Sequence, residues 1–224
     1  MHVGRVMQTQ LVTVPPDTSL TSAQKIIEEK KIAHLLIVDA DEKLLGIVSD
    51  RDLKQSWASP ATSLSVHELN YLLNQMTVGM IMIKTPITVT PDTTIERAAR
   101  LMQENRISAL PVVDKGQLAG IITTTDVMEV LLQAIGIDTD SARFTVLVKD
   151  RVGVMAEISQ HLKDKGVNIR SLVTWPERKH PGLYQLVMRV PAKDKDQAIE
   201  ILQKDGFKVL TEYVDDFSPF LPEA

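Results

Sequence analysis

Two copies of one sequence pattern make up the first part of the chain. The segment Val3–Met7 matches Val78–Met82, and Gly46–Asp52 matches Gly120–Asp126 after a one-residue slip in the preceding turn. A copy this small buries a core poorly by itself, so repeated units gain stability by packing against each other. We therefore predict two similar small units, packed together, over residues 1–136.

Each copy has the pattern of a helix, two short strands and a second helix. In the first copy, Pro16–Thr18 offers N-cap candidates for a helix with apolar residues at helical spacing. Strands are predicted at Leu35–Val38 and Leu45–Val48, and the second helix opens at Ser49. The second copy repeats this order. Between the copies, Val66–Met76 has a helical pattern and is predicted to bridge the two units.

Both copies carry the same motif, which starts at the end of one predicted strand and continues through the next. The strand ends in Ile-Val-Asp or Val-Val-Asp, and the next strand reads Gly, two apolar residues, Ser or Thr, two further residues and Asp. In these features the copies resemble cystathionine-β-synthase (CBS) motifs, and two in tandem resemble a Bateman module, a pseudo-two-fold sandwich with two clefts. The resemblance covers roughly residues 1–135 and implies clefts that bind AMP, ADP, ATP or S-adenosylmethionine.

The segments Ser49–Asp52 and Thr123–Asp126 allow two interpretations. A hydroxyl followed three residues later by an acid is a capping box, which would only hold the start of a helix. The same helix start presents free N–H groups to a phosphate, and a nearby carboxylate can accept hydrogen bonds from ribose hydroxyls. Because the pattern occurs at matched positions of a duplication that resembles this family, the binding interpretation is favoured.

The resemblance also implies that each cleft draws residues from both copies, with apolar members enclosing an adenine ring. The first cleft is expected to contain Ser49, Arg51, Asp52, Thr85, Ile87, Ile107 and Ser108. The second cleft is expected to contain Gln10, Val12, Ile32, Ala33, Thr123 and Asp126.

The two expected clefts differ in their polar residues. Thr85 is a candidate for phosphate contact, whereas its counterpart Gln10 departs from the Thr or Ser common in the family. Arg51 adds a cation where the second copy has Thr125, although a solvated surface arginine is an equally good interpretation. The first cleft is therefore expected to be better equipped for a nucleotide.

The pattern of apolar and turn residues in the remainder of the chain predicts strands and helices in the order βαββαβ, the ferredoxin-like arrangement. The last strand is predicted at Phe207–Val214. Its motifs, Asp-Arg-x-Gly-Val-Met-Ala-Glu-Ile from Asp150 and Gly-Val-Asn-Ile from Gly166, resemble the ACT domain over roughly residues 142–214. That resemblance implies an amino acid or other small effector bound by Asp150, Gly153, Val154, Met155 and Asn168. The alternative is that Gly153 serves only a tight turn and Asn168 only a local backbone cap, in a domain used for dimerisation.

Composition excludes several classes of function. Cysteine is absent, which excludes disulfides, cysteine-ligated metal sites and a thiolate nucleophile. With 25 basic and 29 acidic residues, the chain lacks the positive excess that nucleic-acid binding uses. No phosphate-binding glycine loop or serine-nucleophile elbow is present, so no catalytic residue is predicted. His67-Glu68 lacks the second histidine of an H-E-x-x-H motif and the histidines do not cluster in sequence, so no metal site is predicted. No secretory signal or apolar run of membrane length is found, so we expect a cytoplasmic protein without a membrane partner.

The predicted fold class is α/β, a tandem CBS pair followed by an ACT domain. The predicted order is CBS 1 (1–56), a helical connector (57–77), CBS 2 (78–136), a linker (137–141), the ACT domain (142–214) and a tail (215–224). This combination resembles the acetoin-utilisation B type of protein. We expect a non-enzymatic regulator, a homodimer that senses an adenine nucleotide and acts on an unidentified protein partner. Two alternatives remain, a structural subunit with empty clefts and, less favoured, an acetoin-pathway hydrolase or deacetylase.

Overall fold

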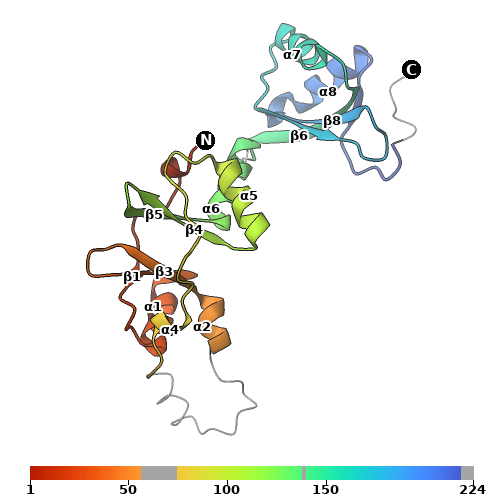
Figure 1. The fold of residues 1–224 in the computed structure, drawn as a ribbon. Coiled ribbons are helices and arrows are strands. Elements are labelled where there is room, and N and C mark those ends of the chain that lie inside the picture. The colour runs from red at the N-terminus through yellow and green to blue at the C-terminus, as the bar shows by residue number, and fades with distance from the viewer. Residues whose placement is uncertain (57–74, 138–139, 218–224) are drawn as a thin grey trace. The chain divides into compact units, whose positions relative to one another are not determined.

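The computed structural model describes residues 1–56, 75–137 and 140–217, so most of the predicted helical connector and tail lies outside the described residues. The chain divides into two compact units, Met1–Met128 and Glu129–Ala224. Figure 1 shows the helices and strands of each unit. No helix in these ranges is long and apolar enough to cross a membrane.

The first copy of the repeat forms a three-stranded sheet with two helices. Strand β1 pairs in parallel with β2, and β2 pairs antiparallel with β3. The elements are β1 (Thr13–Val14), α1 (Leu20–Lys30), β2 (His34–Val38), β3 (Leu44–Ser49) and α2 (Asp50–Ser56). The predicted strands are thus confirmed to within one residue.

The second copy repeats this order with a two-stranded sheet, β4 against β5. Its elements are α4 (Val78–Ile81), α5 (Ile95–Asn105), β4 (Ala109–Asp114), β5 (Gln117–Thr123) and α6 (Thr124–Ala134). The counterpart of α4 at the start of the first copy is a short 3-10 helix, η1 (Val3–Arg5).

The caps of the first helices lie later than Pro16–Thr18. Ser19 caps α1 by accepting a hydrogen bond from the Ser22 N–H, and Thr94 caps α5 in the same way. Thr18 lies before the cap, and its carbonyl oxygen accepts a hydrogen bond from the Val78 N–H. The predicted N-cap position was therefore wrong by one residue.

The opening segments of the two copies are exchanged. Gln8 of the first copy pairs with Ile121 on β5 of the second, and Ile83 of the second copy pairs with Ile47 on β3 of the first. In Figure 1 the N-terminus accordingly lies beside α5. Each copy thus adds an isolated β-bridge to the sheet of the other, and these contacts help to hold the two copies in one unit.

A shared apolar cluster lies where the sheets of the two copies meet. Leu36, Ile47 and Ala109 are buried in it, with partly buried residues from both copies around them. A second cluster beneath the first sheet is centred on Leu20, Leu35 and other buried side chains of the first copy. Burial of apolar area at the joint explains why two such small copies form one stable unit.

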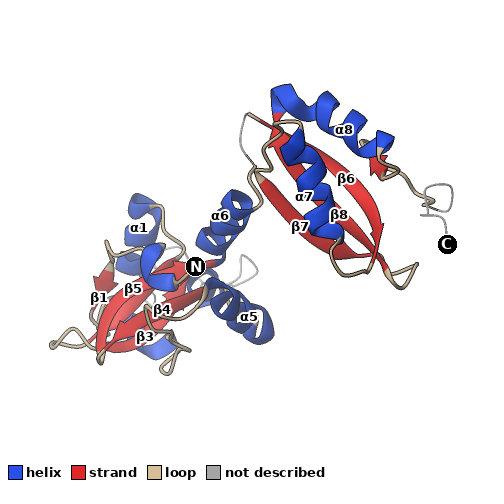
Figure 2. Cartoon of the chain, turned by 90° about the horizontal axis from the view of Figure 1, so that it is seen from above, coloured by secondary structure: helices blue, strands red, loops and turns tan. Residues whose placement is uncertain are grey.

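The second unit has the predicted βαββαβ order, and its sheet order is β7-β8-β6-β9. Its elements are β6 (Ser141–Lys149), α7 (Val154–Asp164), β7 (Ser171–Pro176), β8 (Leu183–Pro191), η2 (Ala192–Asp194), α8 (Lys195–Lys204) and β9 (Lys208–Leu210). Both α7 and α8 cover one face of the sheet, as Figure 2 shows, and bury a core around Phe144, Ile158 and Leu202.

The last strand is shorter than the predicted Phe207–Val214. Strand β9 pairs with β6 only up to Leu210, which is its last buried residue. Thr211, Glu212 and Tyr213 are exposed and lie outside the strand.

Candidate functional site

A cleft of about 500 Å³ lies between the two copies of the first unit, at the point where β3 passes into α2. Of the residues predicted for the first cleft, five line it: Ser49, Arg51, Asp52, Ile107 and Ser108. Thr85 and Ile87 do not line this cavity, and the chain before them contributes Ile83 instead. Ala33, expected in the second cleft, lines the first as well, and the lining is completed by residues that were not predicted as cleft residues: His34, Ile47, Asp50, Arg106 and Ala109.

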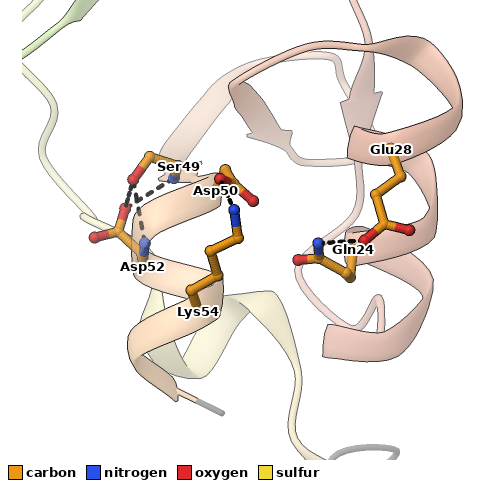
Figure 3. Close-up of polar contacts among 6 residues, drawn as sticks. All are labelled: Gln24, Glu28, Ser49, Asp50, Asp52 and Lys54. Atoms are coloured by element: carbon orange, nitrogen blue, oxygen red, sulfur yellow. Dashed lines mark hydrogen bonds and ion pairs between the residues drawn. The ribbon is translucent and has the colours of Figure 1, made fainter.

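The start of α2 forms the capping box predicted at Ser49 and Asp52. The Asp52 Oδ2 atom accepts hydrogen bonds from the Ser49 backbone N–H at 2.8 Å and from the Ser49 hydroxyl at 2.6 Å. The Asp52 N–H in turn donates to the Ser49 Oγ atom at 3.2 Å (Figure 3). These bonds use one carboxylate oxygen, and the other, Oδ1, has no hydrogen-bond partner among the described residues.

The neighbouring acid on the same helix has a different role. Asp50 forms an ion pair with Lys54, one turn further along α2, at 2.6 Å. In Figure 3 this pair lies to one side of the Ser49–Asp52 contacts. Asp50 is thus paired with a cation through one oxygen, whereas Asp52 uses one oxygen for the helix cap and faces no cation with the other among the described residues.

The second copy reproduces the capping box with one difference. The Asp126 Oδ2 atom accepts from the Thr123 N–H and from the Thr123 hydroxyl, both at 2.7 Å. Its Oδ1 atom accepts a further hydrogen bond from the Gln8 side chain at 3.2 Å. Both oxygens of Asp126 are thus occupied, whereas Asp52 has one available.

A second cleft of about 500 Å³ lies at the start of α6. Five predicted residues line it: Gln10, Val12, Ile32, Ala33 and Thr123. Asp126 does not line this cavity, although its partner Gln8 does. The other lining residues include Lys31 and Thr125, and Thr125 is the uncharged counterpart of Arg51.

The wall between the clefts contains His34. Its Nε2 atom lies 3.0 Å from the Ser108 hydroxyl, and both residues line both clefts. Burial lowers the pKa of His34, and this outweighs the opposite effect of the Asp52 carboxylate. The lowered pKa favours the uncharged imidazole, which serves as a hydrogen-bonding wall residue.

The second unit contains a smaller cavity of about 250 Å³ beside the start of α7. Of the five predicted effector residues only Val154 lines it, together with Lys149, Arg151 and Glu157. Arg151 and Glu157 form an ion pair across this region. Asp150, Met155 and Asn168 are exposed outside this cavity, so their role in effector binding stays a prediction.

Gly153 has a definite structural reason for its identity. Its φ of +88° lies in the left-handed region at the N-cap of α7, which a side chain rarely adopts. A Cβ there would meet nothing within 4 Å, so the position is open in front of the helix start. Both interpretations of Gly153, tight turn and ligand approach, are compatible with this geometry.

Comparison with known families decides what kind of protein carries these clefts. The CBS domain family model matches residues 3–58 and 78–133, and the ACT domain model matches residues 142–207. The chain is a CBS-domain protein with an ACT domain. No group of three or more His, Asp or Glu side chains able to hold a metal ion is found over residues 1–56, 75–137 and 140–217.

Several relatives share only the CBS pair. A CBS domain-containing protein of Dictyostelium discoideum is 33% identical over 134 residues, which are 59% of this chain and 92% of that protein. Homoserine O-acetyltransferase of Methanohalobium evestigatum is 32% identical over 131 residues, which are 58% of this chain and only 24% of that enzyme. CBS pairs thus occur both as nearly whole proteins and as parts of enzymes.

Solved structures give the same result. A Vibrio cholerae structure named for the acetoin utilization protein AcuB is 31% identical and covers 61% of this chain and 94% of its own, with a TM-score of 0.51. The CBS-pair protein CBSX2 of Arabidopsis thaliana is 36% identical and covers 59% of this chain and 94% of its own, with a TM-score of 0.50. Both likenesses extend over little more than half of this CBS-domain protein.

Proposed function

We propose that this CBS-domain protein is a non-enzymatic regulator that binds an adenine nucleotide or S-adenosylmethionine in the clefts of its CBS pair. The observation that carries the proposal is the arrangement of Asp52. One of its oxygens holds the helix start and the other is unengaged beside a cleft of about 500 Å³. The structural and the binding roles of the motif are therefore compatible, because each uses a different oxygen.

The size and chemistry of the first cleft support an adenylate. A cavity of about 500 Å³ is in the usual range for small-molecule sites. The apolar Ile47, Ile83 and Ile107 offer surfaces for a flat base, while Ser49 and the start of α2 offer donors to a phosphate. The carboxylate of Asp52 is an acceptor suited to the two hydroxyls of a ribose.

A second candidate function is an interaction subunit whose clefts stay empty. It is favoured at the second cleft, where Gln8 occupies the remaining oxygen of Asp126. We further propose that the ACT domain takes a small effector or pairs two chains into a homodimer, and that the likeness to AcuB reflects a role in acetoin utilisation. An acetoin-pathway hydrolase or deacetylase is the least supported alternative, since the described clefts lack an activated nucleophile motif.

Isothermal titration with AMP, ADP, ATP and S-adenosylmethionine tests the proposal. Asp52→Asn should weaken binding of at least one ligand about tenfold, because an amide presents one acceptor in place of two. Ser19→Ala is the matched control, since it removes a helix cap of similar kind outside the clefts and should leave binding intact. Absence of heat with all four ligands would favour the interaction subunit.

A further inference from the structure

Two helices of the CBS pair end in an unusual way. Lys31 caps α1 with a φ of +52°, and Arg106 caps α5 with a φ of +55°. In each case the cap N–H bonds back to a carbonyl of the last helical turn. A Cβ is disfavoured in this left-handed conformation, which is why glycine is the usual residue at such an end.

Elsewhere the same chain does use glycine after a helix. Gly136, Gly166 and Gly206 follow α6, α7 and α8 with φ values of +72°, +74° and +85°. The left-handed ends of α1 and α5 instead carry long, positively charged side chains. Lys31 and Arg106 also occupy matched positions of the repeat, since each precedes an isoleucine that leads into β2 or β4, respectively.

Both cations line a cleft. Arg106 of the second copy lines the first cleft, where it faces the site that contains Ser49 and Arg51 of the first copy. Lys31 of the first copy lines the second cleft together with Thr123 of the second copy. Each cation is exposed, and neither has an ion-pair or hydrogen-bond partner for its side chain in the described part of the chain.

We propose that Arg106 and Lys31 are the phosphate-binding cations of the two clefts, each reaching the ligand from the copy opposite to the capping box. This inference rests on the proposed binding of an adenylate. The first cleft then has two guanidinium groups, Arg106 and Arg51, each able to bind two phosphate oxygens at once. The second cleft has the single ammonium of Lys31, so the first cleft should prefer AMP over adenosine more strongly.

Glycine variants separate this role from a structural one. Arg106→Gly relieves the left-handed conformation, so the midpoint of thermal unfolding should stay the same or rise. Affinity for AMP at one site should nevertheless fall about tenfold, while affinity for adenosine should not change. Lys31→Gly should weaken AMP at the other site, and Arg106→Lys should restore part of the lost affinity.

Lys115→Gly is the matched control. Lys115 also has a left-handed φ, +48°, but it lies in the turn between β4 and β5 and lines neither cleft. Its replacement should leave the affinities for AMP and adenosine unchanged. The assay is isothermal titration of the full chain with each ligand, combined with thermal unfolding of each variant.

The outcomes distinguish a failure of the cation assignment from a failure of the proposed nucleotide binding. If the unsubstituted chain binds AMP and both glycine variants bind it equally well, the assignment of the cations is overturned and nucleotide binding stands. If Arg106→Gly weakens adenosine as much as AMP, the side chain does not act on the phosphate and the assignment also fails. If the unsubstituted chain binds none of AMP, ADP, ATP and S-adenosylmethionine, both proposals are overturned, and if it binds only S-adenosylmethionine, the assignment of the phosphate-binding cations alone is overturned.

Discussion

The exchange of opening segments makes a quantitative prediction at Gly120. A Cβ built on Gly120 would lie 2.6 Å from the Met7 Sδ atom and 3.0 Å from the Gln8 carbonyl oxygen. Ordinary contacts of a Cβ begin at 3.4 Å, so the sulfur must move by about 0.8 Å (3.4 − 2.6) for Gly120→Ala to fit. Overpacking of this kind costs about 1–3 kcal/mol.

The direction in which Gly120→Ala changes the stability is informative because the backbone of Gly120 has no positive φ in this structure. At such a position, alanine would stabilise the chain by about 0.4–1 kcal/mol if there were room, since it restricts the unfolded state. We expect a net loss instead, with a fall in the thermal midpoint of roughly 2–4 °C for each kcal/mol. Urea unfolding gives the free energy of unfolding directly.

A double-mutant cycle identifies the cause. Most of the obstruction at Gly120 is the flexible Met7 side chain, so adding Met7→Ala should recover part of the loss, with a coupling energy of about 0.5–2 kcal/mol. At the matched Gly46, the Ile83 carbonyl oxygen lies 2.7 Å from the Cβ position, and the backbone cannot be removed. Met82→Ala should therefore rescue Gly46→Ala much less. A stabilising Gly120→Ala, or equal rescue at both glycines, would refute the close approach of the exchanged segments.

Two further predictions concern the clefts. Burial holds the pKa of His34 below its ordinary 6.5, so the unfolded chain binds more protons than the folded one, and the free energy of unfolding should decrease as the pH falls below about 6.5. His34→Gln should reduce this decrease in urea titrations between pH 7.5 and about 5; an unchanged pH profile would count against a buried imidazole. Gln8→Ala should free the Oδ1 atom of Asp126 and strengthen AMP binding at the second cleft by about two- to tenfold in isothermal titration. Weaker binding would show that Gln8 itself contacts the ligand.

The sequence predicted those features that depend on local pattern. The capping boxes at Ser49 and Thr123 follow from spacing of three residues along one helix start, and the strands follow from short apolar runs. The βαββαβ order of the second unit was predictable for the same reason. The arrangement of two clefts came from the resemblance of the duplicated copies to a Bateman module.

The remaining features depend on contacts between distant segments. Arg106 has no sequence signal that places it in the cleft lined by Arg51, since that cleft forms only when the two copies pack together. The Gln8–Asp126 hydrogen bond joins residues 118 positions apart. In the sequence, Lys31 and Arg106 each precede an isoleucine directly after a predicted helix. This matched pair of cations is a signal that could have drawn attention to them.

The exchanged opening segments are relevant to how a two-copy chain can arise from single-copy chains. A polypeptide with a single copy would leave one edge of its short sheet without the β-bridge that Gln8 or Ile83 now supplies. Two identical single-copy chains could satisfy both edges by trading these segments reciprocally. Covalent fusion of that pair would turn a concentration-dependent association into a permanent one, and the halves would then be free to diverge, as the unequal surroundings of Asp52 and Asp126 illustrate.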